Sequence, residues 1–110
     1  MKFYIAGPMA GLPNDNREAF QEAENFLKKR RHDSASPTKN RVPKHACREA
    51  HMKADIRMLL ECGGIFMLTG WEKSRGARLE YDIAIQTGKT IVYQDALRFQ
   101  LLCRSQDKTA

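Results

Sequence analysis

The sequence predicts an α/β fold: a three-layer sandwich in which a parallel sheet of about four strands lies between helices, in one small domain. Three observations predict it. Short apolar segments of strand length alternate with longer segments of helical periodicity. Glycine-containing turns follow two of the apolar segments. The chain of 110 residues suffices for one hydrophobic core and not for two, so we expect one domain over residues 1–104 and a frayed tail over residues 105–110.

The first half of the chain predicts a strand, a helix and a short second strand. Residues 2–6 form an almost continuous apolar run, as in a central parallel strand. A helix is predicted after them because Asp15 and Glu18 have the spacing of a capping box, and because apolar residues then recur on one helical face. Residues 34–36, just before a proline, predict a short edge strand.

The second half repeats this alternation. We expect a helix over about 44–61, a strand over 65–68, a helix between Ser74 and Gly88, and a strand over 90–93. Asp95 would begin a short terminal helix that includes Leu97, Leu101 and Leu102. Such alternation implies right-handed crossovers with helices on both faces of the sheet, which is a flavodoxin/Rossmann-like architecture.

Composition favours a cytoplasmic protein. Its three cysteines, Cys47, Cys62 and Cys103, are odd in number and widely spaced, which fits reduced thiols better than a disulfide framework. No apolar run approaches the ~20 residues of a membrane span. Lys2 is followed by strand-like residues rather than by a signal-peptide core. We therefore expect no membrane association.

The net charge of +6 is concentrated in the segment from Lys28 to Arg57. A basic patch can bind nucleic acid, but such a run is more often a solvated face, and the run over 28–31 also complements the end of a helix. No zinc spacing and no interleaving of aromatic and basic residues accompanies it. We interpret the charge as an attraction for anionic ligands, with nucleic acid as the less favoured alternative.

Two loops are expected to meet at one edge of the sheet. The first, after the first strand, is formed by Gly7, Pro8, Met9, Ala10 and Gly11. Its glycines allow a ligand to approach the backbone. The second crosses from the third strand to the next helix, where Ser74 has the position of an N-cap and the free amides beyond it can bind an anion. Ligands of open α/β sheets bind at this edge.

Three residues near this edge are candidate site residues, and each also has a purely structural interpretation. Glu80 would lean back over Gly76 and Ala77, which leaves room for a sugar phosphate; alternatively it is a surface glutamate. Asp55 is an isolated acid on a basic and apolar helix, where it could equally be solvated or pair with a neighbouring cation. Trp71 could stack on a base or fill the edge of the core.

A metal site is not expected. His45, Cys47 and His51 are close in sequence, but only Cys47 and His51 share a helical face, and a fourth ligand is not evident. We expect neither a metal nor another cofactor.

These motifs resemble the nucleoside 2-deoxyribosyltransferase superfamily, including its small, often phage-encoded members. The resemblance covers residues 4–89 and rests on three pieces. They are the run Tyr4-Ile5-Ala6-Gly7-Pro8-Met9, the acid Asp55, and the pattern Ser74-x-Gly76-Ala77-x-x-Glu80-x-x-x-Ala84-x-x-x-Gly88-Lys89.

The resemblance implies an N-glycosidase or (deoxy)ribosyltransferase. Glu80, expected to be ionised at neutral pH, corresponds to the nucleophile that attacks the anomeric carbon. Tyr4 corresponds to the tyrosine that orients it, and Asp55 to the acid that assists departure of the base. Ser74 matches the phosphate-binding serine of the nucleotide-hydrolysing branch. With the basic charge and the first glycine loop, this serine points to a nucleoside 5′-monophosphate as substrate.

Two further implications concern partners and competence. The resemblance implies a homodimer or higher homo-oligomer, since relatives complete their pockets across a subunit interface. Gly63 stands where relatives usually have an aspartate just before the third strand. The alternatives are therefore a nucleotide-binding sensor or sequestering protein without turnover, and, less favoured, a basic nucleic-acid-binding module.

Overall fold

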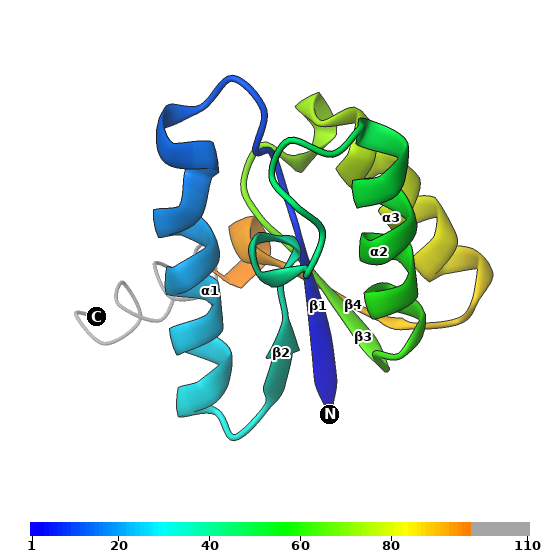
Figure 1. Cartoon of the computed structure of the whole chain (residues 1–110). Helices are drawn as coiled ribbons and strands as arrows, with labels where there is room; N and C mark the ends of the chain where they lie inside the picture. Colours follow the sequence, from blue (N-terminus) through cyan, green and yellow to red (C-terminus); the bar gives the residue numbers. More distant parts are fainter. Residues whose placement is uncertain (98–110) are drawn as a thin grey trace, which may run out of the picture.

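The structure is a computed structural model that describes residues 1–97, in which strands and helices alternate as predicted (Figure 1). The strands are β1 (Lys2–Ala6), β2 (Asp33–Ala35), β3 (Gly64–Met67) and β4 (Thr90–Tyr93). The helices are α1 (Arg17–Lys29), α2 (Arg48–Leu60) and α3 (Arg75–Gln86), with 3₁₀ turns η1 (Pro13–Asn16), η2 (Pro37–Lys39) and η3 (Trp71–Lys73). Residues 94–97 begin one more helical segment; Leu101, Leu102, Cys103, the predicted boundary at residue 104 and the predicted tail lie outside the described residues.

The four strands form one parallel sheet in the order β2-β1-β3-β4, which confirms the predicted α/β architecture. The chain moves from β1 outward to β2, then returns past β1 to β3 and continues to β4. It therefore changes direction between β1 and β3, which are neighbours in register from Phe3 opposite Gly64 to Ala6 opposite Met67. Open α/β sheets bind ligands at the carboxyl ends of the strands beside such a switch point.

The two faces of the sheet are covered by different helices. Alternate residues of β1 point to opposite faces, so Phe3 and Ile5 pack with α1, whereas Tyr4 and Ala6 pack beneath α2 and α3. Figure 1 shows α1 on one side of the sheet, where Leu97 of the helical segment over 94–97 also packs, and α2 beside α3 on the other. Because both faces are covered, β1 is apolar at nearly every position. Its one polar group on the α3 side is the Tyr4 hydroxyl.

The beginnings of α1 and α2 differ from the predictions. Asn14, Asp15 and Asn16 have left-handed backbones with φ of 53°, 54° and 60°, which Asn and Asp tolerate better than most residues. The helix therefore begins at Arg17 after Asn16, without a side-chain cap, and the predicted capping box of Asp15 is wrong. The Asn16 amide instead donates to the Pro8 carbonyl at 2.9 Å. α2 begins at Arg48 rather than near residue 44.

Candidate active site

A buried pair of side chains joins β1 to α3. The Tyr4 hydroxyl donates a hydrogen bond to Oε2 of Glu80 at 2.5 Å. Tyr4 is 0% and Glu80 5% exposed, so Glu80 is not a surface glutamate on an amphipathic helix. Glu80 lies in the second turn of α3 and Tyr4 in the strand below it. The fold thus brings together two residues that are 76 positions apart in the sequence.

Burial changes the protonation of this pair. Loss of hydration raises the pKa of Glu80 to about 8; the hydrogen bond from Tyr4 opposes this rise, and the negative charge of Asp55 adds to it. Burial, with the nearby Glu80 charge, also raises the pKa of Tyr4 well above its usual range, so Tyr4 remains a donor. In the free protein the Glu80 carboxyl group is therefore mostly protonated at neutral pH, contrary to the ionised state that we expected.

Asp55 lies near this pair, but its hydrogen-bond partner is a residue that the sequence analysis missed. Asn40, directly after η2, donates from Nδ2 to Oδ1 of Asp55 at 2.8 Å. The described residues show no ion pair between Asp55 and Arg57 or Lys53. Burial raises the pKa of Asp55, whereas the Asn40 hydrogen bond and the nearby His51 lower it. Asn40 lies outside any periodic segment, so only its position next to the turn Pro37–Lys39 could have drawn attention to it.

Ser74 has the predicted capping role. Its Oγ accepts the backbone N–H of Ala77 at 3.2 Å, as an N-cap side chain does. The hydroxyl hydrogen is not used in this bond and is available to donate to an anion. Gly76 and Ala77 follow, but the space over Gly76 is not open: a Cβ there would be 3.5 Å from Sδ of Met52 on α2. Met52 therefore covers part of the patch that we expected to hold a sugar.

The first glycine loop meets the second at the predicted edge. A Cβ on Gly7 would lie only 2.7 Å from the side chain of Leu68, so this position requires glycine for packing. Pro8 lies beside Gly70, where a Cβ would be 3.6 Å from its ring, and this contact joins the two loops. Met9 packs toward the α1 side, and Gly11 is exposed with a φ of +79°.

Trp71 packs within an aromatic cluster. Its ring lies over that of Tyr81, with centroids 4.5 Å apart and planes inclined by 31°. The Tyr81 hydroxyl in turn hydrogen-bonds the Tyr93 hydroxyl at 2.7 Å. Trp71 therefore fills the edge of the core, which was the structural alternative, and its face toward Tyr81 is not free to stack on a base.

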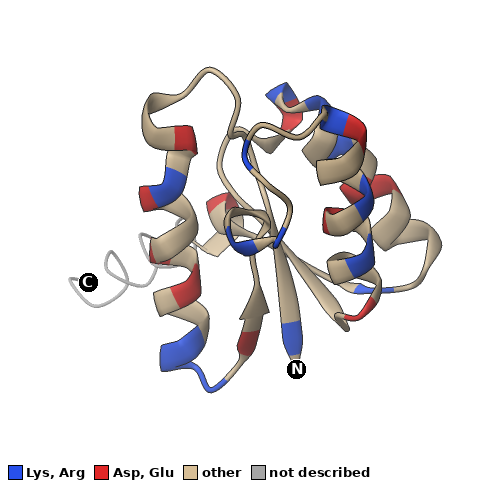
Figure 2. Cartoon of the chain, in the orientation of Figure 1, with Lys and Arg blue, Asp and Glu red and all other residues tan. Residues whose placement is uncertain are grey.

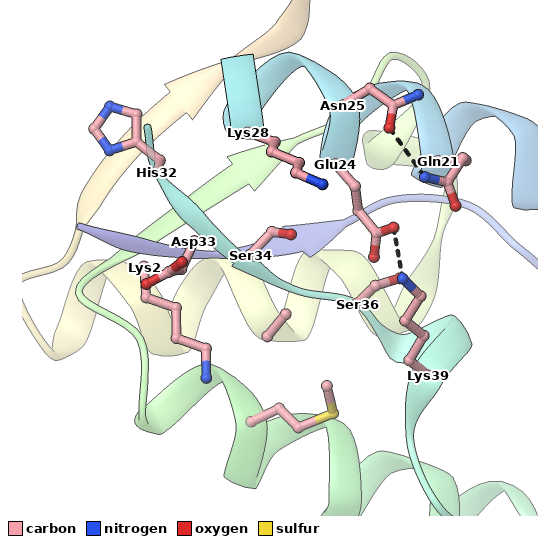
Figure 3. Close-up of a pocket in the computed structure, with 12 residues that line it drawn as sticks. Lys2, Gln21, Glu24, Asn25, Lys28, His32, Asp33, Ser34, Ser36 and Lys39 are labelled. Carbon is pink, nitrogen blue, oxygen red and sulfur yellow. Dashed lines mark hydrogen bonds and ion pairs between the residues drawn. The ribbon is translucent and has the colours of Figure 1, made fainter. Parts of the chain in front are cut away.

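A cavity of about 670 Å³ lies elsewhere in the described part of the chain. It opens along the edge strand β2, between α1 and the segment after β2, and Lys2, Lys28, His32, Ser34 and Lys39 are among its lining residues (Figure 3). A second cavity of about 360 Å³ lies between β2 and α2 and reaches Asn40. Tyr4, Glu80 and Ser74 line neither of these cavities, so the Glu80 carboxyl group is covered in this conformation.

Basic residues lie on α2, at the end of α1 and in the loop before α2 (Figure 2). This loop carries Lys44, whose ammonium group is 4.0 Å from the carboxylate of Asp15. Within residues 1–97, no group of three or more His, Cys, Asp or Glu is placed to hold a metal ion. In the same part of the chain no helix has the length and apolar character needed to cross a membrane.

Gly63, where the resemblance led us to expect an aspartate, lies just before β3, at its amino end. Gly63 is exposed, its N–H donates to the Lys2 carbonyl at 3.1 Å, and a Cβ there would contact the Met1 side chain at 3.3 Å. Ser74 and the glycine loop lie at the opposite, carboxyl ends of the strands. An aspartate at position 63 would therefore project beside Met1.

Comparisons with known proteins agree with this architecture. A 2-deoxyribosyltransferase from Bacillus psychrosaccharolyticus superimposes with a TM-score of 0.69 at 21% identity, over 84% of this chain and 71% of that one. A 2-deoxyribosyltransferase from Leishmania mexicana superimposes with a TM-score of 0.67 at 21% identity, over 84% of this chain and 62% of that one, so this chain spans less than two thirds of its length. No curated protein matches the sequence.

The family assignment comes from the sequence itself. Residues 1–93 match the family described as a domain of unknown function, DUF4406. The match includes all four strands and the Tyr4–Glu80 pair. The chain therefore belongs to the DUF4406 family, and its fold is that of the nucleoside 2-deoxyribosyltransferases.

Proposed function

We propose that this protein cleaves the base–sugar bond of a nucleoside 5′-monophosphate, as an N-glycosidase or a (deoxy)ribosyltransferase. The observation that carries the proposal is the buried hydrogen bond between Tyr4 and Glu80 beneath the helix that begins at Ser74. A carboxyl group is costly to bury, and strongly perturbed acids gather at functional sites. Two solved structures of the same fold are 2-deoxyribosyltransferases, which supports chemistry at a nucleoside.

In the proposed mechanism the ionised Glu80 attacks the anomeric carbon while the bond to the base breaks. Tyr4 holds Oε2, which leaves the other carboxyl oxygen for the attack. The departing base takes a proton from Asp55, whose raised pKa favours the protonated form. Water or a second base then attacks the anomeric carbon of the glutamyl ester and gives a proton to Asp55. The sugar phosphate or a new nucleotide leaves, and Glu80 is released as the carboxylate. The active form thus has Glu80 ionised and Asp55 protonated.

Substrate access requires a movement of α2 in this proposal. Glu80 is 5% exposed, and Met52 lies over Gly76 at the start of α3. Only Leu59, near the end of α2, is fully buried among the residues of that helix. Its first turns are therefore held by fewer buried contacts than its last turn, and they can separate from α3 at smaller cost.

We expect recognition to depend on the phosphate, through Ser74, the amides after it and the loop over 7–11. Replacing Ser74 by Asp tests this, since aspartate is also a good N-cap but its charge repels a phosphate. Calorimetry should show at least about tenfold weaker binding of a nucleoside monophosphate to Ser74→Asp, with the affinity of the free nucleoside unchanged. Equal affinity of the wild-type protein for nucleoside and monophosphate would remove the phosphate from the proposal.

We also expect a homo-oligomer, most simply a dimer. A chain of 110 residues has few loops with which to enclose a ligand alone. The first turns of α2 contain no fully buried residue, so their surface is available to a second subunit. Light scattering at micromolar concentration should report a mass of at least twice 12.6 kDa. A monomer that retains full activity would contradict this expectation.

The second candidate function is a nucleotide-binding sensor, which the covered position of Glu80 favours. Incubation with a panel of nucleoside monophosphates, followed by chromatography of free bases, separates the two functions. Release of one base supports the enzyme. Binding of a nucleotide without base release supports the sensor.

A further inference from the structure

We infer that Asn40 is a positioning residue that determines which oxygen of Asp55 can exchange a proton with a departing base. The proton-transfer part of this inference rests on the proposed function; the positioning part does not. Asn40 reaches Asp55 across 15 positions of sequence, from the turn after β2 to the middle of α2. Asp55 is the only group on α2 that we assign to the chemistry, so its orientation matters for the whole site.

The orientation of the Asn40 amide follows from its neighbours. Its Oδ1 accepts the backbone N–H of Val42 at 3.2 Å. Its Nδ2 donates to Asp55 at 2.8 Å and lies 3.4 Å from Nδ1 of His51. A flipped amide would direct its NH₂ group at the Val42 N–H and its oxygen at the Asp55 carboxylate, so it would lose both bonds. Asn40 therefore presents a donor to Asp55.

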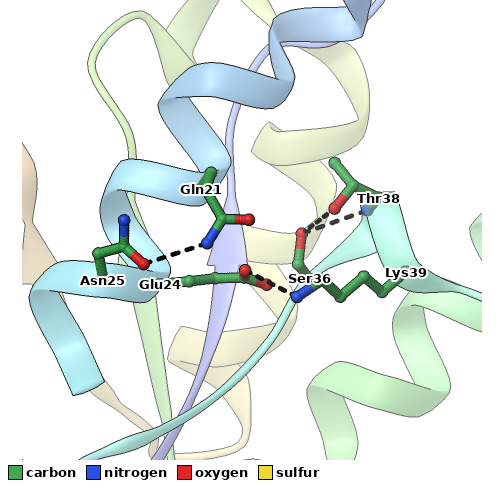
Figure 4. A network of polar contacts seen from close by, with 6 residues as sticks. All are labelled: Gln21, Glu24, Asn25, Ser36, Thr38 and Lys39. Carbon is green, nitrogen blue, oxygen red and sulfur yellow. Dashed lines mark hydrogen bonds and ion pairs between the residues drawn. The ribbon is translucent and has the colours of Figure 1, made fainter.

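The turn that carries Asn40 is itself held by a polar network (Figure 4). Buried Ser36 bonds the hydroxyl of Thr38 at 2.7 Å and caps η2 by accepting the Thr38 N–H at 3.2 Å. The Lys39 ammonium donates to Glu24 of α1 at 2.9 Å. This network lies directly before Asn40 in the chain and attaches its turn to the helix on the far side of the sheet. Hydrogen bonds and an ion pair therefore hold the turn from which Asn40 reaches α2.

The consequence for Asp55 is that its two oxygens differ. Oδ1 accepts from Asn40 and cannot carry a proton on that side without losing the bond, so a proton on Asp55 belongs on Oδ2. Of the other titratable groups, His51 on α2 lowers the pKa of Asp55, and the Asp55 charge raises the pKa of Glu80 on α3 and of Tyr4 on β1. None of them bonds Asp55 in the described residues, so the Asn40 contact sets its orientation.

The test compares wild type with Asn40→Ala, Asn40→Asp and the control Asn25→Ala. Asn25 is a matched control because, within residues 1–97, its amide bonds Gln21 alone, on the exposed side of α1. Carboxyl-carbon NMR should show that Asp55 titrates at higher pH in Asn40→Ala, because a donor to the ionised form is lost. The shift should be larger in Asn40→Asp, which keeps the acceptor for Val42 and adds a like charge. Asn25→Ala should titrate as wild type.

Base release provides the second measurement. In Asn40→Ala we expect kcat to fall by about 10–100-fold, within the range that a positioned acid contributes. KM should change little, because the proposed phosphate-binding site is at Ser74 and the loop over 7–11. An unchanged Asp55 titration in both Asn40 variants would overturn the inference. If wild type releases no base, the proposed function fails, and the titration still decides the role of Asn40. If Asn40→Ala does not fold, Asn40→Asp gives the answer.

Discussion

Replacing Glu80 by Gln is expected to lower turnover by at least about 10³-fold, because the amide cannot form the covalent bond to the anomeric carbon. The variant should fold, since Tyr4 can donate to the amide oxygen as it does to the carboxylate. Ligand binding should largely persist because the proposed phosphate-binding site is at Ser74. Base release and calorimetry on the same samples measure both quantities.

The control is Glu72→Gln, which removes an exposed carboxylate on η3. Its turnover should stay within about twofold of wild type, since exposed substitutions away from buried networks have small effects. Mass spectrometry of wild-type protein quenched during turnover should find a sugar-phosphate adduct on Glu80. Base release by Glu80→Gln at the wild-type rate would show that the covalent mechanism is wrong.

The second large effect is a pH dependence of stability that disappears in Glu80→Gln. The pKa of Glu80 is raised to about 8 in the folded protein from an ordinary value of 4.5, so the folded state holds a proton that the unfolded chain releases. The contribution of this proton to the free energy of unfolding is therefore fully present below about pH 4.5. It falls as the pH rises toward 8 and is lost above that pH. The shift corresponds to a few kcal/mol.

Urea unfolding of both proteins between pH 4 and 9 measures this effect. The free energy of unfolding of wild type should fall relative to that of Glu80→Gln across the interval and then run parallel to it. Titratable groups that do not interact with Glu80 contribute equally to both proteins and cancel in the comparison, whereas the coupling between Asp55 and Glu80 is part of the measured effect. Parallel curves at every pH would mean that folding does not raise the pKa of Glu80.

Local patterns were sufficient to predict the elements of the fold. The apolar runs, the helical periodicities, the glycine stops and the proline after the second strand predicted the four strands and the three α-helices between residues 2 and 93. Their alternation predicted the parallel sheet. Ser74 was predictable as an N-cap because capping depends on the next three residues only. The capping role predicted for Asp15 was wrong, because Asn14, Asp15 and Asn16 adopt left-handed backbones and α1 begins only after them.

Candidate residues were less predictable than elements. Glu80 and Asp55 drew attention by their positions in the sequence, Tyr4 was selected by the resemblance of motifs, and the roles of all three are proposals. Asn40 escaped sequence reasoning because its partner is on another element and no local pattern marks it. Trp71 was ambiguous, since stacking on a base and packing on Tyr81 need the same aromatic face.

By itself, then, the sequence determined the order and type of the elements and placed two glycine-containing loops at one edge of the sheet. The tertiary structure alone decided that Glu80 is buried against Tyr4, that burial raises its pKa to about 8, and that Met52 covers Gly76. Secondary structure depends on neighbours a few residues apart. Hydration and hydrogen bonding of a side chain depend on which segments pack around it, and Tyr4 and Glu80 meet only because β1 lies beneath α3 in the folded protein.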